Sequence, residues 1–151
     1  MKQRVPAWKP SEPVHLNARR VLPELLRDYY ASGRKLGDDS DPRDMHAFRL
    51  KTKHLRYTLE AFTSLYGPGL KQKTDRLRPI QNALGELNDC QVLLAELGNR
   101  LTHAVRNHIH RRAGGKRGEF LRYWREEFDA ADEDKKWEQY LTRSARVRQP
   151  R

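Results

Sequence analysis

Apolar residues recur every three or four positions along most of this chain, and no segment shows the apolar–polar alternation of a strand. The clearest case lies in residues 45–62. Its apolar stripe comprises Met45, Phe48, Thr52, Leu55, Leu59 and Phe62. A period near 3.6 residues places these side chains on one face of a helix. We therefore expect an all-α fold.

A second stripe of the same segment is basic and is offset from the apolar one by one residue. It comprises His46, Arg49, Lys53 and Arg56, which share roughly 80° of the helix surface. No acid lies between Asp44 and Glu60. Lysines and arginines on a soluble helix usually alternate with carboxylates. A basic face without them indicates that an external polyanion binds there.

Composition supports the same view. The 151 residues include 31 Lys+Arg and 20 Asp+Glu, so the formal net charge of +11 attracts acidic macromolecules. Only 36% of residues are hydrophobic, which predicts a small core and makes burial against a second subunit plausible. The single cysteine, Cys90, excludes an intrachain disulfide. With no signal-like or membrane-length apolar run, we expect a cytoplasmic protein.

Glycine, proline and short polar residues mark the predicted ends of helices. We expect four helices near 12–35, 42–66, 70–87 and 89–112, and one more beyond 118. Asp41 and Pro42 form a typical helix start. Gly85 with Asn88 and Asp89 predicts a kink or cap, and residues 113–118 a Gly-rich break.

Short connections between these helices favour an antiparallel four-helix bundle with a C-terminal helical extension. The predicted organisation is a flexible N-terminal tail (1–10), the bundle (11–113), the extension (114–146) and a basic tail (147–151). The aromatic residues of the extension are expected in the core or in a dimer contact, rather than stacked on nucleobases. They include Tyr123, Trp124, Phe128, Trp137 and Tyr140.

Two motifs on this frame resemble the CHAD family of α-helical domains. The first is the run from His46 through Arg49 to Lys53-His54-Leu55-Arg56. The second, Ile80-Gln81 followed by LGELND at 84–89, is similar to the family's LQ-x-x-LG-x-x-(R/N)D signature. The resemblance covers about residues 13–105 and is closest to one of the two helical halves found in that family.

The resemblance implies binding of inorganic polyphosphate by basic residues in a groove between two halves, with no catalytic activity and no cofactor. Because this chain supplies one half, a homodimer would be needed to complete the groove. The alternative is a nucleic-acid-binding protein, which rests on net charge alone because no helix-turn-helix or zinc-finger spacing is present.

Further basic residues are candidates for the same polyphosphate surface. Lys73 and Arg76 share one helix face, as do Arg20 and Arg27. Asn88 and Asp89 are interpreted as a helix cap, with Asp89 alternatively orienting a basic residue. His46 is expected either to donate to phosphate or to bond a backbone group or Asp89.

Catalytic and metal sites are not expected. No nucleophile with an adjacent base, P-loop or carboxylate cluster is evident in the sequence. His103, His108 and His110 are close in sequence, but their neighbours are arginines rather than further metal ligands. We therefore interpret this region as basic surface.

Overall fold

The computed structural model describes residues 6–146, and within them the protein is helical with no strand. The all-α prediction is confirmed. The helices are α1 (Val14–Arg34), α2 (Pro42–Ala61), α3 (Thr63–Tyr66), α4 (Pro68–Asp75), α5 (Arg78–Leu97), α6 (His103–Tyr123) and α7 (Glu133–Arg143). A 3₁₀ turn, Gly98–Arg100, precedes α6, and a π-helical turn, Trp124–Phe128, follows it.

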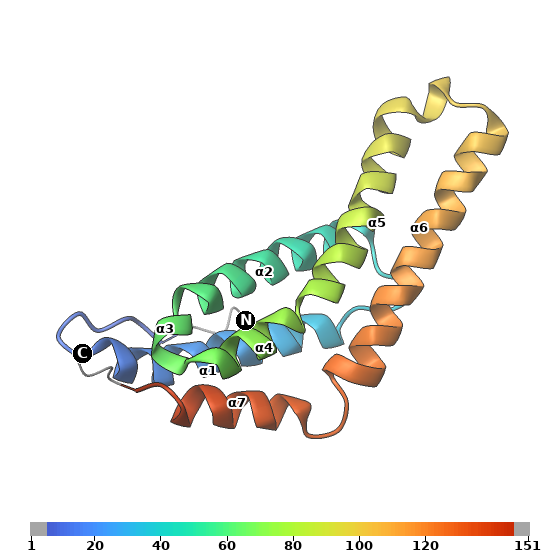
Figure 1. Ribbon diagram of the computed structural model, residues 1–151. Helices are drawn as coiled ribbons and strands as arrows, with labels where there is room; N and C mark the ends of the chain where they lie inside the picture. The colour runs from blue at the N-terminus through green and yellow to red at the C-terminus, as the bar shows by residue number, and fades with distance from the viewer. Residues whose placement is uncertain (1–5, 147–151) are drawn as a thin grey trace.

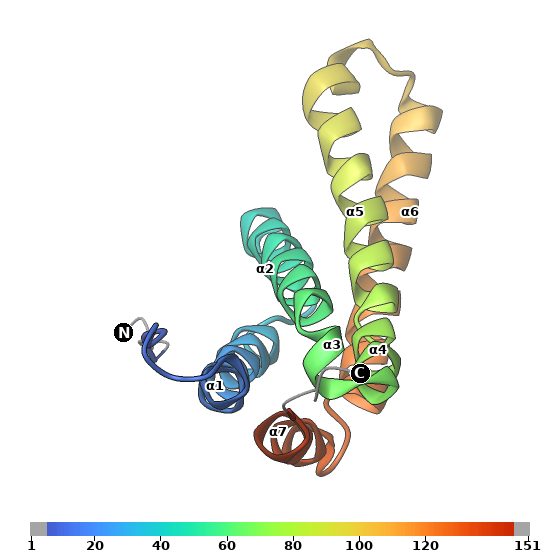
Figure 2. The same cartoon turned by 60° about the vertical axis from the view of Figure 1, so that its left-hand side comes forward.

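The helices form a packed body and a projecting arm, and the antiparallel four-helix bundle is not confirmed. In the body, α1 packs against α2 and α7, and α2 packs against α5 (Figure 1). Helices α5 and α6 pair along their length and continue beyond the other helices, as Figure 2 shows from a second side. We call residues 89–112, at the free end of this pair, the arm.

An aromatic cluster joins the C-terminal segment to the centre of the body. Trp124 lies edge-on to Phe48, with ring centroids 5.5 Å apart, and Tyr29 stacks on Phe48 at 4.7 Å. Tyr30 stacks on Phe128 at 5.1 Å and donates its hydroxyl to the Phe128 carbonyl at 2.8 Å. Each of these large rings buries much apolar area, which suits a chain of low hydrophobic content.

The C-terminal aromatic residues are therefore core residues of one subunit. Trp124, Phe128 and Trp137 are 3%, 0% and 0% exposed. Of the two expected places, core or dimer contact, these three residues occupy the core, because the π-helical turn and α7 fold back onto α1 and α4. Large hydrophobic side chains that are exposed on the arm are Val92, Leu93, Leu97 and Val105.

Several predicted helix ends differ from the observed ones. The predicted helix 70–87 is divided after Asp75, because Pro79 has no N–H and restarts the helix at α5. The predicted break at Gly85, Asn88 and Asp89 is wrong, because α5 runs through all three. Their tendency to end a helix is overridden by packing of α5 against α2 and α6.

The predicted Gly-rich break at 113–118 is also wrong, since α6 is continuous to Tyr123. Gly114, Gly115 and Gly118 all lie within the helix, and Phe120 and Leu121, which follow them, are buried. Helix α2 ends at Ala61 rather than near 66, and Thr63–Tyr66 form the separate turn α3. The predicted start of α2 is confirmed, with the Asp41 side chain accepting a hydrogen bond from the Arg43 N–H at 2.8 Å.

The N-terminal segment from Pro6 lies against the body. The Asn17 side chain bonds both the N–H and the carbonyl of Lys9, at 2.8 and 2.9 Å. The Trp8 ring lies 6.0 Å from the Phe62 ring. Residues 1–5 of the predicted flexible tail and the predicted basic tail, 147–151, lie outside the described residues.

The packing of Trp124 generates a prediction for Gly33, near the end of α1. A Cβ atom at Gly33 would lie 2.3 Å from two ring atoms of the buried Trp124 indole. We expect Gly33→Ala to destabilise the fold by about 1–3 kcal/mol, because the indole has no room to shift. Gly115→Ala is the matched control, since a Cβ there meets nothing within 4 Å, and we expect it to stabilise α6 by about 1 kcal/mol. Urea unfolding of both variants measures the difference, and equal effects of the two would contradict this packing.

Candidate anion-binding groove

The rotation of α2 places its basic stripe at the edge of the body, beside α5. Its apolar residues Met45, Phe48, Thr52, Leu55 and Leu59 are buried. The neighbouring basic side chains must then lie at the boundary between the buried face of α2 and its exposed face. Arg49 lines a hollow of about 380 Å³ with α5 residues Gln81, Asn82, Gly85, Glu86 and Asp89. We call this hollow, together with the basic stripe of α2, the groove.

His46 closes the arm-side end of the basic stripe. Its Nδ1 lies 2.9 Å from the Oδ1 atom of Asn88, on α5. Sequence reasoning placed Asn88 as a helix cap and gave His46 a backbone group, Asp89 or a phosphate as partner. Asn88 instead lies inside α5 and ties its side chain to α2, which fixes the width of the groove at this point.

Within the stripe, Arg49 and Lys53 are the two cations that no carboxylate pairs among the described residues. Among residues 6–146, no carboxylate lies within 4.0 Å of either side chain, and both are half-buried. The Nε atom of Arg49 is buried with no hydrogen-bond acceptor among the described residues, and Gln81 Oε1 is likewise buried without a donor. Buried polar groups normally form hydrogen bonds, so these two groups can bond to an external ligand at this edge of the groove.

Arg56 ends the stripe on the other side. Its guanidinium lies over the Tyr57 ring, 5.0 Å from the centroid, and its Nε atom is 3.3 Å from Glu60 Oε1. The Arg56 side chain is only 15% exposed, so the ring and the helix hold it in place. From His46 to Arg56 the stripe spans ten residue-to-residue steps, or about 15 Å along the helix axis.

The two acidic residues of the groove differ in how they are paired. Glu86 lies 2.5 Å from Lys116 and 3.7 Å from Arg112, both on α6. The hydrogen bond from Lys116 lowers the pKa of Glu86, and its charge is balanced by α6. Asp89 lies at the arm-side end of the groove, where its charge limits how far an anion can extend past His46.

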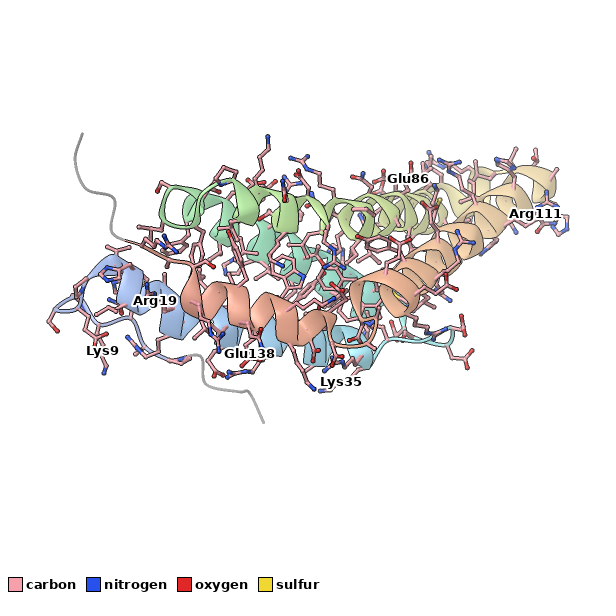
Figure 3. The ribbon with its side chains drawn as sticks, turned by 60° about the horizontal axis from the view of Figure 1, so that its bottom comes forward. Lys9, Arg19, Lys35, Glu86, Arg111 and Glu138 are labelled. Carbon is pink, nitrogen blue, oxygen red and sulfur yellow. The ribbon has the colours of Figure 1, made fainter. Side chains whose placement is uncertain are left out.

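The other four predicted binding residues lie away from the groove and make contacts within the fold. Arg20 bonds Asn17 at 2.8 Å and lies 3.3 Å from Glu12. Arg27 bonds Glu24 on α1 and Glu138 on α7. In Figure 3, Glu138 on α7 and Glu86 on α5 lie on opposite sides of the molecule. Arg20 therefore holds the N-terminal segment to α1, and Arg27 joins α1 to α7.

Lys73 and Arg76 attach α4 to the C-terminal segment. Lys73 Nζ lies 5.3 Å from the Trp137 ring and 5.2 Å from the Tyr140 ring, and burial lowers the pKa of its amine. Arg76 bonds Glu133 at 2.8 Å and the Glu127 carbonyl at 3.0 Å. Sequence spacing placed these residues on one face correctly, but it could not show that α7 would occupy that face.

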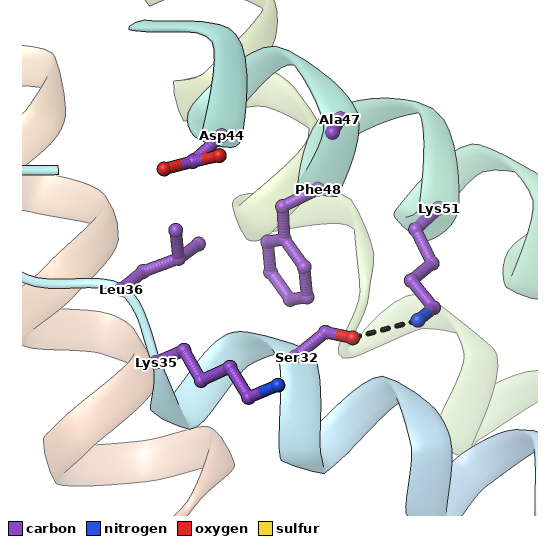
Figure 4. Close-up of a pocket in the computed structure, with 7 residues that line it drawn as sticks. All are labelled: Ser32, Lys35, Leu36, Asp44, Ala47, Phe48 and Lys51. Atoms are coloured by element: carbon purple, nitrogen blue, oxygen red, sulfur yellow. Dashed lines mark hydrogen bonds between the residues drawn. The ribbon is translucent and has the colours of Figure 1, made fainter. Parts of the chain in front are cut away.

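A second hollow, of about 310 Å³, lies between α1 and α2 on the side away from the groove (Figure 4). Phe48 and Leu36 form its apolar wall. Lys51 donates to the Ser32 hydroxyl at 2.6 Å and lies 2.5 Å from Asp28. Its charge is therefore already balanced, in contrast to that of Arg49.

Two global features complete the description. Among residues 6–146, no three His, Cys, Asp or Glu side chains gather in a way that could hold a metal ion. In the same part of the chain, no helix combines the length and the apolar character needed to cross a bilayer.

Comparison with known proteins identifies one similarity. A family model described as CHAD domain matches residues 1–98 of the 151-residue chain. The match includes the whole basic stripe and all of α5 up to Leu97. No curated protein and no solved structure matches the chain.

The contacts of Arg76 predict a structural role for it. We expect Arg76→Gln to destabilise the fold by about 1–2 kcal/mol, because Glu133 and the Glu127 carbonyl lose a charged donor. Affinity for polyphosphate should remain within about twofold. Arg76 lies away from the groove, so salt screens most of its electrostatic effect on a ligand bound there. Thermal unfolding and a binding titration on the same variant test both parts. A variant of unchanged stability but strongly weakened binding would show that Arg76 is part of the anion-binding site.

Proposed function

The chain belongs to the CHAD family, and we propose that it binds inorganic polyphosphate in the groove between α2 and α5, without catalysing a reaction on it. The family is known for binding polyphosphate, which supports the choice of ligand. The observation that carries the proposal is the basic stripe itself: two half-buried cations, Arg49 and Lys53, have no carboxylate within 4.0 Å among the described residues.

Electrostatics explains why such a stripe favours binding. Four basic side chains on one 15 Å edge raise the local positive potential, and partial burial weakens its screening by salt. An anion that lies along α2 relieves this repulsion and supplies acceptors to the guanidinium groups. Some basic residues elsewhere are paired within the fold, for example Arg34 with Asp129 at 2.7 Å.

The side chains of the groove suit a repetitive, flexible anion. The Arg49 and Arg56 guanidiniums can each bond two phosphate oxygens with a planar fork. Lys53 adds a mobile point charge that adapts to the chain between them. The spacing of three and four residues places these cations at short intervals along a line, which matches a single thin chain of phosphates.

We infer a binding role rather than an enzymatic one from the groups around the stripe. A phosphoryl-transfer site needs a positioned nucleophile and a base or metal ligands beside the phosphate. Of the two carboxylates that line the groove, Glu86 is engaged by Lys116 and Arg112, and Asp89 stands alone. The amides of Gln81 and Asn82 offer hydrogen bonds to an anion but no acid–base chemistry.

The first prediction for this function is a loss of binding on removal of the stripe. We expect Arg49→Ala, Lys53→Ala and Arg56→Ala together to weaken polyphosphate binding by about a hundredfold or more at 0.1 M salt, because three charge-assisted contacts are lost. The slope of log affinity against log salt should become shallower by about two to three. Titration calorimetry with polyphosphate of one defined chain length measures both quantities.

The matched control removes three exposed cations outside the groove, Lys71, Lys135 and Arg143, and changes the net charge equally. We expect it to weaken binding only severalfold, through long-range attraction alone. If the two triple variants lose affinity equally, net charge explains binding and the groove is not a site.

We further propose that polyphosphate stabilises a homodimer. The family resemblance implies two helical halves around one ligand, and in this proposal two copies of the chain supply them. Two basic grooves that face each other repel until an anion lies between them, so a ligand that bridges them binds the dimer preferentially. The exposed arm residues Val92, Leu93, Leu97 and Val105 provide apolar area for contact between subunits.

Light scattering coupled to gel filtration tests this assembly at micromolar protein. We expect the mass to rise toward twice 17.8 kDa when polyphosphate is added, and we expect no such rise for the stripe variant. A protein that binds polyphosphate tightly yet keeps the mass of one subunit would rule out the dimer and leave a one-sided groove.

A further inference from the structure

Helix α6 presents a second basic surface, on the side that faces away from α5. Its outward residues are Ala104, Asn107, Arg111, Gly114, Gly118 and Arg122. They recur every three or four positions and share about 80° of the helix surface. All six are exposed, and Arg125 follows them, also exposed, in the π-helical turn. We call these seven residues the outer face of α6.

The charge of this helix is predominantly positive. Helix α6 contains six Lys+Arg residues and one acid, Glu119, which lies 3.1 Å from Lys116. Lys116 and Arg112 are directed toward Glu86 of α5. On the outer face, no carboxylate among residues 6–146 lies within 4.0 Å of Arg111 or Arg122. Arg111 and Arg122 are therefore available to an external anion, whereas Arg125 lies 4.0 Å from Asp38.

The shape of the outer face differs from that of the groove. Between Arg111 and Arg122 lie only small neutral residues along the face, and a Cβ at Gly114 or Gly118 would meet nothing within 4 Å. Glycine costs a helix about 1 kcal/mol relative to alanine, and no contact within this chain requires it at either position. The backbone of α6 is therefore accessible between Arg111 and Arg122, and these two charges lie about 16 Å apart along the helix axis.

We propose that the outer face of α6 binds the major groove of double-stranded DNA. The B-form major groove is about 12 Å wide and admits an α-helix, so Arg111 and Arg122 can reach phosphates on its two sides. The glycines between them let the helix backbone approach the base edges closely. A single phosphate chain, in contrast, is matched by closely spaced cations such as those of α2.

The position of the outer face permits this docking. Arg111 lies on the part of α6 that belongs to the arm, which projects beyond the body (Figures 1 and 2). Figure 3 shows Arg111 on the arm side of the molecule, far from Lys9. Arg122 lies near the other end of α6, where the helix joins the body. The surface is separate from the groove, so the proposal does not rest on polyphosphate binding.

Fluorescence anisotropy with a labelled 16-base-pair DNA duplex tests the charges of the outer face on the full chain. We expect Arg111→Gln with Arg122→Gln to weaken duplex binding about tenfold at 0.1 M salt, with a salt slope shallower by about two. Lys71→Gln with Arg143→Gln removes the same charge from exposed sites elsewhere and should cost much less. Equal losses in the two double variants, or no duplex binding by the unaltered protein, would overturn the proposal.

A second variant tests shape without a change of charge. Gly114→Gln with Gly118→Gln should raise the melting temperature, because glutamine favours a helix over glycine. The same variant should weaken duplex binding severalfold, because two side chains now hold the helix away from the base edges. Unchanged binding by this more stable protein would show that the helix does not enter the groove.

Two further measurements define which duplex binds and where it lies on the protein. An RNA duplex of the same sequence should bind more weakly, since the A-form major groove is too narrow for a helix, and equal binding would overturn the major-groove assignment. The variant Arg49→Ala with Lys53→Ala should retain duplex binding while it loses polyphosphate. If it loses both ligands together, the two anions share the groove between α2 and α5, and the outer face of α6 is not a site.

Discussion

The burial of one face of α2 determines where the charge of this protein is displayed. Phe48, Leu55 and Leu59 must enter the core, and this fixes the rotation of the helix about its axis. Because the basic stripe is offset by a single residue, the same rotation sets Arg49 beside α5 and leaves Lys53 half-buried on the same face of α2. A rotation that buried those cations would cost several kcal/mol for each unpaired charge. The apolar stripe thus positions the basic one.

The acids of the chain are distributed unevenly around this arrangement. On the side of α1 and α7, Asp129, Asp134 and Glu133 pair with Arg34 and Arg76. The hydrogen bond from Arg34 lowers the pKa of Asp134, and those from Lys136 and Arg76 lower that of Glu133. Carboxylates with a lowered pKa stabilise the fold above their ordinary pKa and lose that contribution as the pH falls through the lowered value. Acidification should thus loosen the attachment of α7.

Much of the fold could be predicted from residue patterns, because helical periodicity is a local property. The start of α2 at Asp41 and Pro42 and its two stripes were predicted correctly. The breaks at Gly85–Asp89 and 113–118 were not, because pairing of α5 with α6 outweighs the low helix propensity of glycine and asparagine. The arm could not be foreseen either, since nothing local shows that α5 and α6 continue past the other helices.

The candidate site was predicted in part for the same reason. The stripe on α2 is a property of one helix, and the structure places two of its residues against α5: His46 contacts Asn88, and Arg49 lines the hollow with Gln81. The contact of His46 with Asn88 and the contacts of Arg76 with Glu133 join residues 42 and 57 positions apart. No spacing within one helix reveals such pairs. Long-range packing therefore decided which basic residues are left free.

The central claim is that Arg49 and Lys53 remain uncompensated until an external phosphate chain binds. NMR spectra of the arginine Nε–H groups test it most directly, because each guanidinium reports its own hydrogen bonds. On addition of polyphosphate, we predict that the Arg49 and Arg56 resonances shift strongly and in step with saturation. The resonances of Arg34 and Arg76, already bonded to carboxylates, should stay in place. If Arg49 does not respond while the protein binds polyphosphate, the groove between α2 and α5 is not where the ligand lies.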